Sequence, residues 1–333
     1  MRIIAFVNSN SGPSYHRLIL PLLLMHNVDV FITNDLRVEK FEKGVDLFIY
    51  NRVLPEHALP QVEQLRKQYG FRVCVDVDDH WDLDPHHILF DEYVINNFAE
   101  RQIAQLRSAD LVTTTHSRLA TEIKQYNSNV HVCANAIPNK GQFDIERFPH
   151  HLTRLFWQGS ITHREDIALL KWPVEGLANI AKKIKMVMAG FVDGEPEWHS
   201  MVLDYTACHK HQYQLLEGLH VNEYYSHYQH ADICLIPLLN SPFNRHKSNL
   251  KVLEAAHLGL PVIASKVNPY LDLPIMYARN SYDWVHNIER LVASRKRQKE
   301  AGQELKEYCD VWYNFDKINE HRRQLLTHKF ARV

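Results

Sequence analysis

SPFNRHKSNLKVLEAAHLGLPVIAS, residues 241–265, is the stretch that decides the fold of this 333-residue chain. It follows an apolar strand and is typical of a polar loop, a helix and a second apolar strand. The helix is predicted to begin near Ser248, a plausible N-cap, and a Gly-Leu-Pro sequence ends it. Its N-terminus, with Lys247 alongside, suits a phosphate, and Glu254 can accept two hydrogen bonds from a ribose diol. The alternative is an ordinary capped helix with an exposed lysine and glutamate.

Apolar strand-like runs alternate with helical stretches on both sides of this segment. The first series comprises residues 3–8, 28–33, 46–50, 72–77, 111–115 and 130–135, and the second 154–159, 183–190, 215–221, 231–238 and 260–265. Strands separated by helices are typical of parallel sheets covered on both faces. We therefore predict an α/β protein with two Rossmann-like, doubly wound domains facing a central cleft. The domains are expected at 1–150 and 151–310, with a C-terminal helix at about 311–333 packing back onto the first.

Composition narrows the class of protein. The chain is 45% hydrophobic and 23% charged, which excludes an intrinsically disordered protein. A net charge of −1 argues against a partner held by bulk electrostatics, although the first half is acidic and the second basic. The cysteines are odd in number and dispersed, so we expect a reducing, cytoplasmic location. No signal peptide or membrane-length apolar run is recognisable, so no integral membrane association is expected. The basic run at 294–300 is interpreted as a solvated helix face.

The segment 241–265 resembles the donor-binding motif of the retaining glycosyltransferases of family 4, in the variant F-N-x-x-K-S-x-L-K-x-x-E followed by G-x-P-V-I-A-S. The matching residues are Phe243, Asn244, Lys247, Ser248, Leu250, Lys251, Glu254, Gly259, Pro261, Val262, Ile263, Ala264 and Ser265. The resemblance implies the GT-B fold and a nucleoside-diphosphate sugar, such as a UDP-sugar, as donor substrate, with no cofactor and no divalent metal expected.

By the same resemblance, Lys247, Ser248, Asn249 and Leu250 lie at the donor diphosphate and Glu254 at the ribose. Arg164 or Lys251 is expected to supply a second basic group. The family has a further glutamate where this chain has His246, which predicts an unusual donor sugar.

Other fragments resemble the family in the same order. In WQGSITHRED (157–166), which resembles the pattern G-S-x-x-H-x-x-D, the candidates near the phosphates are Gly159, Ser160, His163 and Arg164. The alternative is a capped helix start at Thr162, with Asp166 in its first turn. Gly12 matches a glycine in the family's loop after the first strand, and Asn135 matches the family signature at the end of the first domain. Tyr224 lies where the family contacts the base, and its alternative role is helix packing.

DVDDHWDLDPHH (76–87) follows a predicted strand at its carboxyl end, where doubly wound domains place functional groups. One interpretation is a metal site, since Asp76 and Asp78 have a spacing used for manganese. The favoured one is catalysis or acceptor recognition by Asp78, Asp79 and His86. A third is structural, with aspartates capping a helix. His116 is a further candidate catalytic residue near the transferred sugar, or else a helix-start residue.

Together these features predict a glycosyltransferase, hexosyl- or pentosyl-transferring, that is retaining and metal-independent. The expected acceptor is a saccharide, or a hydroxymethylated base in bacteriophage DNA if the chain is phage-encoded and acts in the host cytoplasm. Two alternatives stay open: a nucleotide-sugar-binding protein without transfer activity, and a GT-B-fold epimerase. The oligomeric state is left open.

Overall fold

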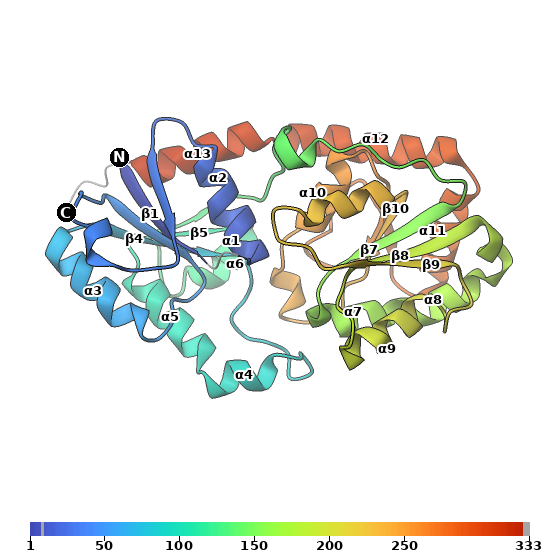
Figure 1. Cartoon of the computed structure of the whole chain (residues 1–333), viewed down its shortest axis with the longest axis horizontal. Helices are drawn as coiled ribbons and strands as arrows, with labels where there is room; N and C mark the ends of the chain where they lie inside the picture. The colour runs from blue at the N-terminus through green and yellow to red at the C-terminus, as the bar shows by residue number, and fades with distance from the viewer. Residues whose placement is uncertain (8–9, 329–333) are drawn as a thin grey trace.

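The computed structural model describes residues 1–7 and 10–328 and contains two parallel, six-stranded sheets lying side by side (Figure 1). The first sheet has the order β2-β1-β3-β4-β5-β6 and the second β12-β11-β10-β7-β8-β9. The first comprises β1 (Arg2–Phe6), β2 (Asp29–Thr33), β3 (Leu47–Asn51), β4 (Arg72–Val77), β5 (Leu111–Thr114) and β6 (Val130–Val132). The second comprises β7 (Thr153–Gln158), β8 (Ile184–Phe191), β9 (Tyr213–Glu217), β10 (Ile233–Ile236), β11 (Val262–Ser265) and β12 (Met276–Ala278).

Helices cover both faces of each sheet. Those between the strands of the first sheet are α1 (Gly12–Ser14), the π-helical η1 (Tyr15–Ile19), α2 (Leu20–Leu23), η2 (Val38–Lys40), α3 (Ala58–Tyr69), α4 (Phe90–Ile95), α5 (Phe98–Ser108) and α6 (Ser117–Ile123). Between the two sheets lies η3 (Gly141–Phe143). Those of the second sheet are η4 (Ile161–His163), α7 (Arg164–Ile167), η5 (Ala168–Leu170), α8 (Lys171–Gly176), η6 (Leu177–Lys183), α9 (Pro196–Tyr205), η7 (Tyr224–His230), η8 (Asn244–His246), α10 (Leu250–His257) and α11 (Ser281–Val292).

Each sheet separates two hydrophobic clusters, because successive side chains of a strand point to opposite faces. In β1, Ile4 packs into one cluster while Ile3 packs into the other. In β7, Trp157 and Phe156 likewise belong to different clusters. Strands buried on both faces are continuous apolar runs, which is why the sequence identified them. The predicted α/β fold with two Rossmann-like domains is confirmed.

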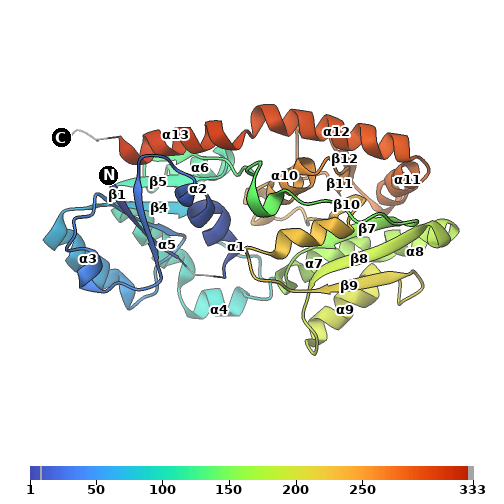
Figure 2. The ribbon, with the colours of Figure 1, turned by 45° about the horizontal axis from the view of Figure 1, so that its top comes forward.

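Two long helices return along the molecule after the second sheet. They are α12 (Arg295–Trp312) and α13 (Phe315–Thr327), and Figure 2 shows α12 over the second sheet and α13 over the first. A Cβ on Gly302 would stand 1.9 Å from the carbonyl oxygen of Gly259, so α12 packs closely against the end of α10 only because residue 302 is glycine. Asn319 donates to the Pro21 carbonyl at 3.0 Å and ties α13 to the first domain.

The predicted domain division at 150/151 falls between β6 and β7. Part of the expected C-terminal helix, residues 329–333, lies outside the described residues, as do Asn8 and Ser9 of the loop after β1. Strand β12 was not predicted from the sequence, and it is a three-residue edge strand. Within the part of the chain that the structure describes, no helix combines the length and apolarity needed to cross a bilayer.

Candidate active site

The N-terminus of α10 lies at the cleft between the two domains. The predicted N-cap was wrong by one residue: Asn249 is the N-cap and the helix begins at Leu250. Ser248 is drawn away from capping because its Oγ accepts a 2.9 Å hydrogen bond from Asn135 of the first domain. Asn135 Oδ1 in turn accepts from the buried Arg17, so the start of α10 is tied into the core of the opposite domain.

Two lysines stand at this helix start. Lys247 Nζ lies 4.7 Å from the ring centre of Phe243 and 3.8 Å from Asp79 Oδ2 across the cleft. Lys251 Nζ lies 5.6 Å from the ring centre of Trp157, and among the described residues no carboxylate oxygen is within 4.0 Å of it. Burial lowers the pKa of Lys251 to about 8, the charge of Asp166 and more weakly that of Glu254 oppose this shift, and the charge of Lys247 adds to it. The charge of the ammonium group is thus only partly compensated by the described residues.

The loop after β7 buttresses the same region. Asp166 Oδ2 is 2.8 Å from His163 Nδ1, while its Oδ1 accepts bonds from the Leu239 amide and the Asn244 side chain. Burial lowers the pKa of His163 to about 4, so its ring is neutral at pH 7. A Cβ on Gly159 would stand 2.7 Å from the Trp157 ring, which leaves room for glycine alone.

The two other candidates on this loop face solvent. Arg164 is exposed and its guanidinium pairs with the adjacent Glu165 at 2.9 Å. Ser160 is exposed, with its hydroxyl 2.7 Å from that of Thr162. Of the two basic groups proposed from the sequence, Lys251 rather than Arg164 therefore lies at the start of α10. Thr162 does not begin a helix as the alternative had it; it lies within η4, and α7 begins at Arg164.

Glu254 is 2% exposed, which differs from the exposed residue of the simple capped-helix alternative. Its two carboxylate oxygens accept hydrogen bonds from Tyr224 and from Tyr228, the latter at 2.8 Å. Burial raises the pKa of Glu254 to about 6 against the effect of these bonds. Tyr224 also lies 2.5 Å from Nε2 of His16 in the first domain. A ribose can reach this carboxylate only after the aromatic contacts rearrange.

In the first domain, Gly12 occupies the first position of α1, after the N-cap Ser11. A Cβ there would meet no atom within 4 Å, so the space beside this glycine is open.

The acidic segment at 76–87 is held by arginines. Asp78 accepts two bonds from Arg52, at 2.7 and 2.8 Å. Although burial raises the pKa of Asp78, the charge and bonds of Arg52 outweigh it and lower the pKa to about 2. Asp76 is paired in the same bidentate way with Arg17, at 2.9 and 2.8 Å. The manganese interpretation fails on this point, because guanidinium groups occupy both carboxylates. No cluster of three potential metal ligands occurs among residues 1–7 and 10–328.

Asp79 and His86 have different surroundings. Asp79 contacts Arg52 at 2.7 Å and faces Lys247, so it is the member of the acidic segment that meets the second domain. His86 is exposed and lines a small cavity of about 190 Å³ together with Arg164 and Lys247. Asp78 is thus paired with Arg52, whereas Asp79 also contacts Lys247 of the second domain and His86 lines a cavity with that lysine.

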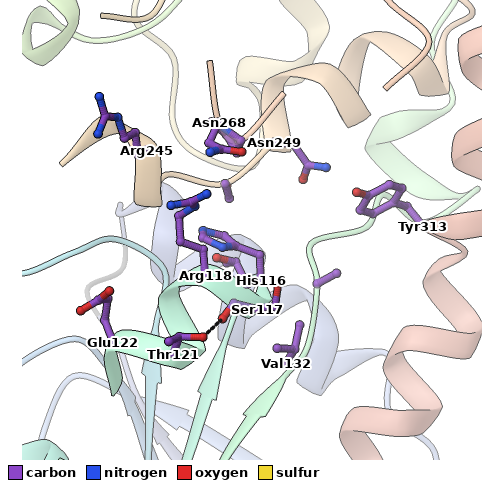
Figure 3. Close-up of a pocket in the computed structure, with 14 residues that line it drawn as sticks. His116, Ser117, Arg118, Thr121, Glu122, Val132, Arg245, Asn249, Asn268 and Tyr313 are labelled. Atoms are coloured by element: carbon purple, nitrogen blue, oxygen red, sulfur yellow. Dashed lines mark hydrogen bonds between the residues drawn. The ribbon is translucent and has the colours of Figure 1, made fainter. Parts of the chain in front are cut away.

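A larger cavity, of about 760 Å³, opens between α6 and the start of α10 (Figure 3). His116 lies at its floor, where its Nδ1 accepts from the Leu119 amide as the N-cap of α6. Its Nε2 is 2.9 Å from the His246 carbonyl oxygen of the other domain. The helix-start interpretation of His116 is thus confirmed, although the residue also lines the cleft. We call this space the α6–α10 cavity; its lining residues are Thr115, His116, Ser117, Arg118, Thr121, Glu122, Val132, Ala134, Arg245, Ser248, Asn249, Asn268, Pro269 and Tyr313.

The structure thus brings together candidates that are far apart in sequence: Lys247, Lys251 and Asp79 at one end of α10, and His116 with Ser248 and Asn249 in the α6–α10 cavity. Sequence reasoning missed His16 and Arg52, which hold Tyr224 and Asp78. Their only sequence signal is that an ionisable residue stands near a predicted strand end, which many surface residues share.

Comparison with known proteins adds to this geometry. The family model of Glycosyl transferases group 1 matches residues 153–293. No curated protein matches the chain in sequence. Among solved structures, Anabaena Alr3699/HepE in complex with UDP and glucose is 14% identical, with 98% of this chain and 99% of that chain covered and a TM-score of 0.64.

Two further structures have the same degree of similarity. An alpha-glucosyltransferase in complex with UDP and a 13-mer DNA containing a HMU base is 13% identical, with 98% and 100% covered and a TM-score of 0.64. An E. coli trehalose-6-phosphate structure bound with UDP-2-fluoro glucose is 12% identical, with both chains fully covered and a TM-score of 0.64. The likenesses establish the GT-B fold, and the family match lies on the domain that carries α10. The chain is a glycosyltransferase.

Proposed function

We propose that the chain is a retaining, metal-independent glycosyltransferase of the family 4 type, which takes a nucleoside-diphosphate sugar on its second domain. The acceptor hydroxyl is held by the first domain. The two domains meet where their parallel strands end, and ligands of doubly wound folds bind at such edges.

One observation carries the proposal: Lys251, at the positive end of α10, has no carboxylate within 4.0 Å among the described residues. A desolvated ammonium group is costly unless an anion compensates it. Its pKa, lowered by burial, expresses that cost. A diphosphate at the helix N-terminus supplies the missing charge, since the first N–H groups of a helix have no partner within it.

The remaining donor contacts follow from this placement. The backbone N–H groups of Ser248, Asn249 and Leu250 face the diphosphate, and the open space beside Gly12 lets the first domain approach it. The glycine at 159 keeps the β7 loop close to the same point. His163, Ser160 and Arg164 act from that loop on the edge of the donor site. Tyr224 and Glu254 bind the nucleoside once the ribose replaces the phenol contacts.

The chemistry needs few protein groups. The bond between the anomeric carbon and the diphosphate oxygen breaks, and a bond from the acceptor oxygen to that carbon forms on the same face. The acceptor proton passes to the departing diphosphate, whose charge is neutralised by Lys247, Lys251 and the helix N-terminus. On the acceptor side we assign Asp79, His86 and His116 to the cleft, with Asp78 holding Arg52 in place as a positioning residue.

The acceptor is a saccharide or a hydroxymethylated DNA base. The saccharide is the broader family expectation, while the DNA alternative is favoured by the alpha-glucosyltransferase neighbour bound to DNA. A phage origin and action in the host cytoplasm belong to the second alternative. A gel-shift on hydroxymethylcytosine DNA at two salt concentrations separates them, because binding to phosphates weakens steeply with salt.

The proposal is tested by incubating the protein with a panel of nucleotide sugars, with and without EDTA. Transfer or donor hydrolysis that EDTA leaves unchanged supports a metal-independent transferase. An altered but intact nucleotide sugar identifies an epimerase, and binding without turnover identifies a nucleotide-sugar-binding protein. Lys247→Ala and Glu254→Ala are expected to weaken UDP binding, with the exposed Lys296→Ala as control. Unchanged UDP affinity in both variants contradicts the donor assignment.

A further inference from the structure

The α6–α10 cavity carries two arginines, one from each domain, that the proposed donor site does not use. Arg118 extends from α6 and Arg245 from η8, and Figure 3 shows both side chains beside the cavity. Neither forms an ion pair with a carboxylate in the described part of the chain; Arg245 donates only to the side-chain oxygen of Asn240, at 2.8 Å. Two guanidinium groups therefore border one cavity without neutralising partners.

The rest of the lining leaves this charge in excess. Glu122 is the one carboxylate among the lining residues, and one of its oxygens already accepts from Gln125 at 3.0 Å. The other polar lining groups are amides, hydroxyls and the ring of His116, whose pKa is lowered by burial.

The wall of the cavity also contains a buried polar atom. Thr115 is 4% exposed and lines the cavity, yet its hydroxyl has no hydrogen-bond partner among the described residues. Buried polar groups in folded proteins are normally paired, so an orphaned hydroxyl beside a cavity is satisfied by a ligand or water. The volume of about 760 Å³ is in the range of small-molecule sites.

We propose that the α6–α10 cavity binds the acceptor through a phosphate group on it, held between Arg118 and Arg245. This inference rests on the proposed function, because the cavity reaches the start of α10, where the donor diphosphate is placed. Planar guanidinium groups match phosphate oxygens in bidentate fashion, which favours phosphate over a single-point anion. Because the two arginines come from different domains, the site is complete only when the domains are together, as they are here.

The phosphate can come from a phosphorylated sugar or from the phosphodiester of a nucleic acid, and the test has an arm for each. With UDP present at saturation, calorimetry measures the binding of glucose 6-phosphate, of glucose as its uncharged counterpart, and of a short hydroxymethylcytosine oligonucleotide. We expect at least one of the phosphate-bearing probes to bind. If the acceptor is a phosphorylated sugar, glucose 6-phosphate should bind at least about tenfold more tightly than glucose.

Variants show whether the two arginines are responsible. Arg118→Ala and Arg245→Ala are each expected to weaken the phosphate probe at least about tenfold, and Arg118→Lys by less. The exposed Arg297→Ala is the matched control and is expected to leave binding unchanged. Both arginines are exposed, so their removal does not threaten folding.

Three results would overturn the inference: no binding of either phosphate probe at millimolar concentration, glucose binding as tightly as its phosphate, or Arg118→Ala and Arg245→Ala binding like the wild type. The affinity for UDP alone is measured in parallel in every variant. It is expected to stay within about twofold of wild type, since these arginines lie outside the proposed diphosphate contacts. Failure of the donor assignment would instead appear as unchanged UDP affinity in Lys247→Ala and Glu254→Ala, so the two failures are distinguishable.

Discussion

Replacing Lys251 by methionine tests the charge at the start of α10 with little change in volume. In the free protein the charged ammonium group of Lys251 lowers the stability of the fold, because burial lowers its pKa from 10.5 to about 8. With a diphosphate bound, the same group becomes a charge-assisted hydrogen-bond donor. Lys251→Met is therefore expected to fold more stably and to bind UDP more weakly, a combination that a purely structural lysine does not produce.

The magnitudes follow from the pKa. A shift of this size corresponds to about 3 kcal/mol, so the free energy of unfolding at pH 7 is expected to rise by on the order of 2–3 kcal/mol. Because the folded-state pKa is below that of the unfolded chain, the unfolded chain binds more protons between pH 8 and 10.5. Stability of the wild type therefore rises with pH across that window, and the rise is lost in the variant. UDP affinity should fall about 10- to 100-fold, the value of a hydrogen bond to a charged group.

Calorimetry of UDP binding at pH 7 and pH 9 measures the affinity, and urea unfolding measures the stability. Lys251 is about nine-tenths protonated at pH 7 and about one-tenth at pH 9, so wild-type affinity should drop about tenfold over this range. The terminal phosphate of UDP titrates near pH 6 and does not contribute. Lys251→Met should show no such drop, and the exposed Lys296→Met should behave as wild type. Equal affinity and an equal pH slope in Lys251→Met would refute the reasoning.

Three other changes probe the rest of the site. Asp78→Asn breaks a bidentate pair with Arg52, and we expect the free energy of unfolding at pH 7, measured in urea, to fall by about 2–4 kcal/mol. The pKa of Asp78 in the folded protein is lowered to about 2, so the wild type should lose this stabilisation as the pH falls from 4 to 2. The pKa of Glu254 is raised to about 6 in the folded protein, so between pH 4.5 and 6 the folded state binds more protons than the unfolded chain and the wild type should lose stability as the pH rises. Glu254→Gln should abolish this decline, and a pH profile of thermal unfolding identical to that of the wild type would contradict the prediction. Asn135→Ala removes a bond between domains to Ser248, and we expect transfer to slow with less than about threefold change in UDP affinity, checked by steady-state kinetics and calorimetry.

The parts of the site that lie within one segment were predictable from sequence. Residues 241–265 carry loop, helix and strand together, so the position of Lys251 and Glu254 on one short helix, with Lys247 just before it, followed from periodicity and the resemblance. The predicted N-cap, Ser248, was wrong because the Ser248 hydroxyl instead accepts a hydrogen bond from Asn135. The local sequence pattern carries no information on a partner that lies over a hundred positions away.

Contacts between segments were not predictable. The acidic segment at 76–87 was interpreted as chemistry, but whether a carboxylate faces a ligand or an arginine depends on where Arg17 and Arg52 are brought by the sheet. Both arginines come from earlier strand–helix units, and only the pairing of β1, β3 and β4 places them beside Asp76 and Asp78. Fold prediction from apolar patterning is insensitive to such pairings, because they leave the strand pattern unchanged.

The contacts that join the domains also determine how the donor enters. Glu254 is buried beneath Tyr224 and His16, so nucleoside binding requires that this part of the cleft open. Burial lowers the pKa of His16 to about 3, so the ring is neutral at pH 7 and the contact is a hydrogen bond between uncharged groups.

Two further contacts between the domains are also uncharged, those of His116 with the His246 carbonyl and of Asn135 with Ser248. Lys247 and Asp79 form a charged pair across the cleft. Each uncharged bond contributes only about 0.5–1.5 kcal/mol net, so breaking these hydrogen bonds costs a few kcal/mol. A diphosphate that compensates Lys251 provides free energy of the same order, and it also attracts Lys247 away from Asp79. Under the proposed function, donor binding is therefore coupled to the acidic segment through one lysine: Asp79 loses its contact with Lys247, keeps its pair with Arg52, and can then meet the acceptor.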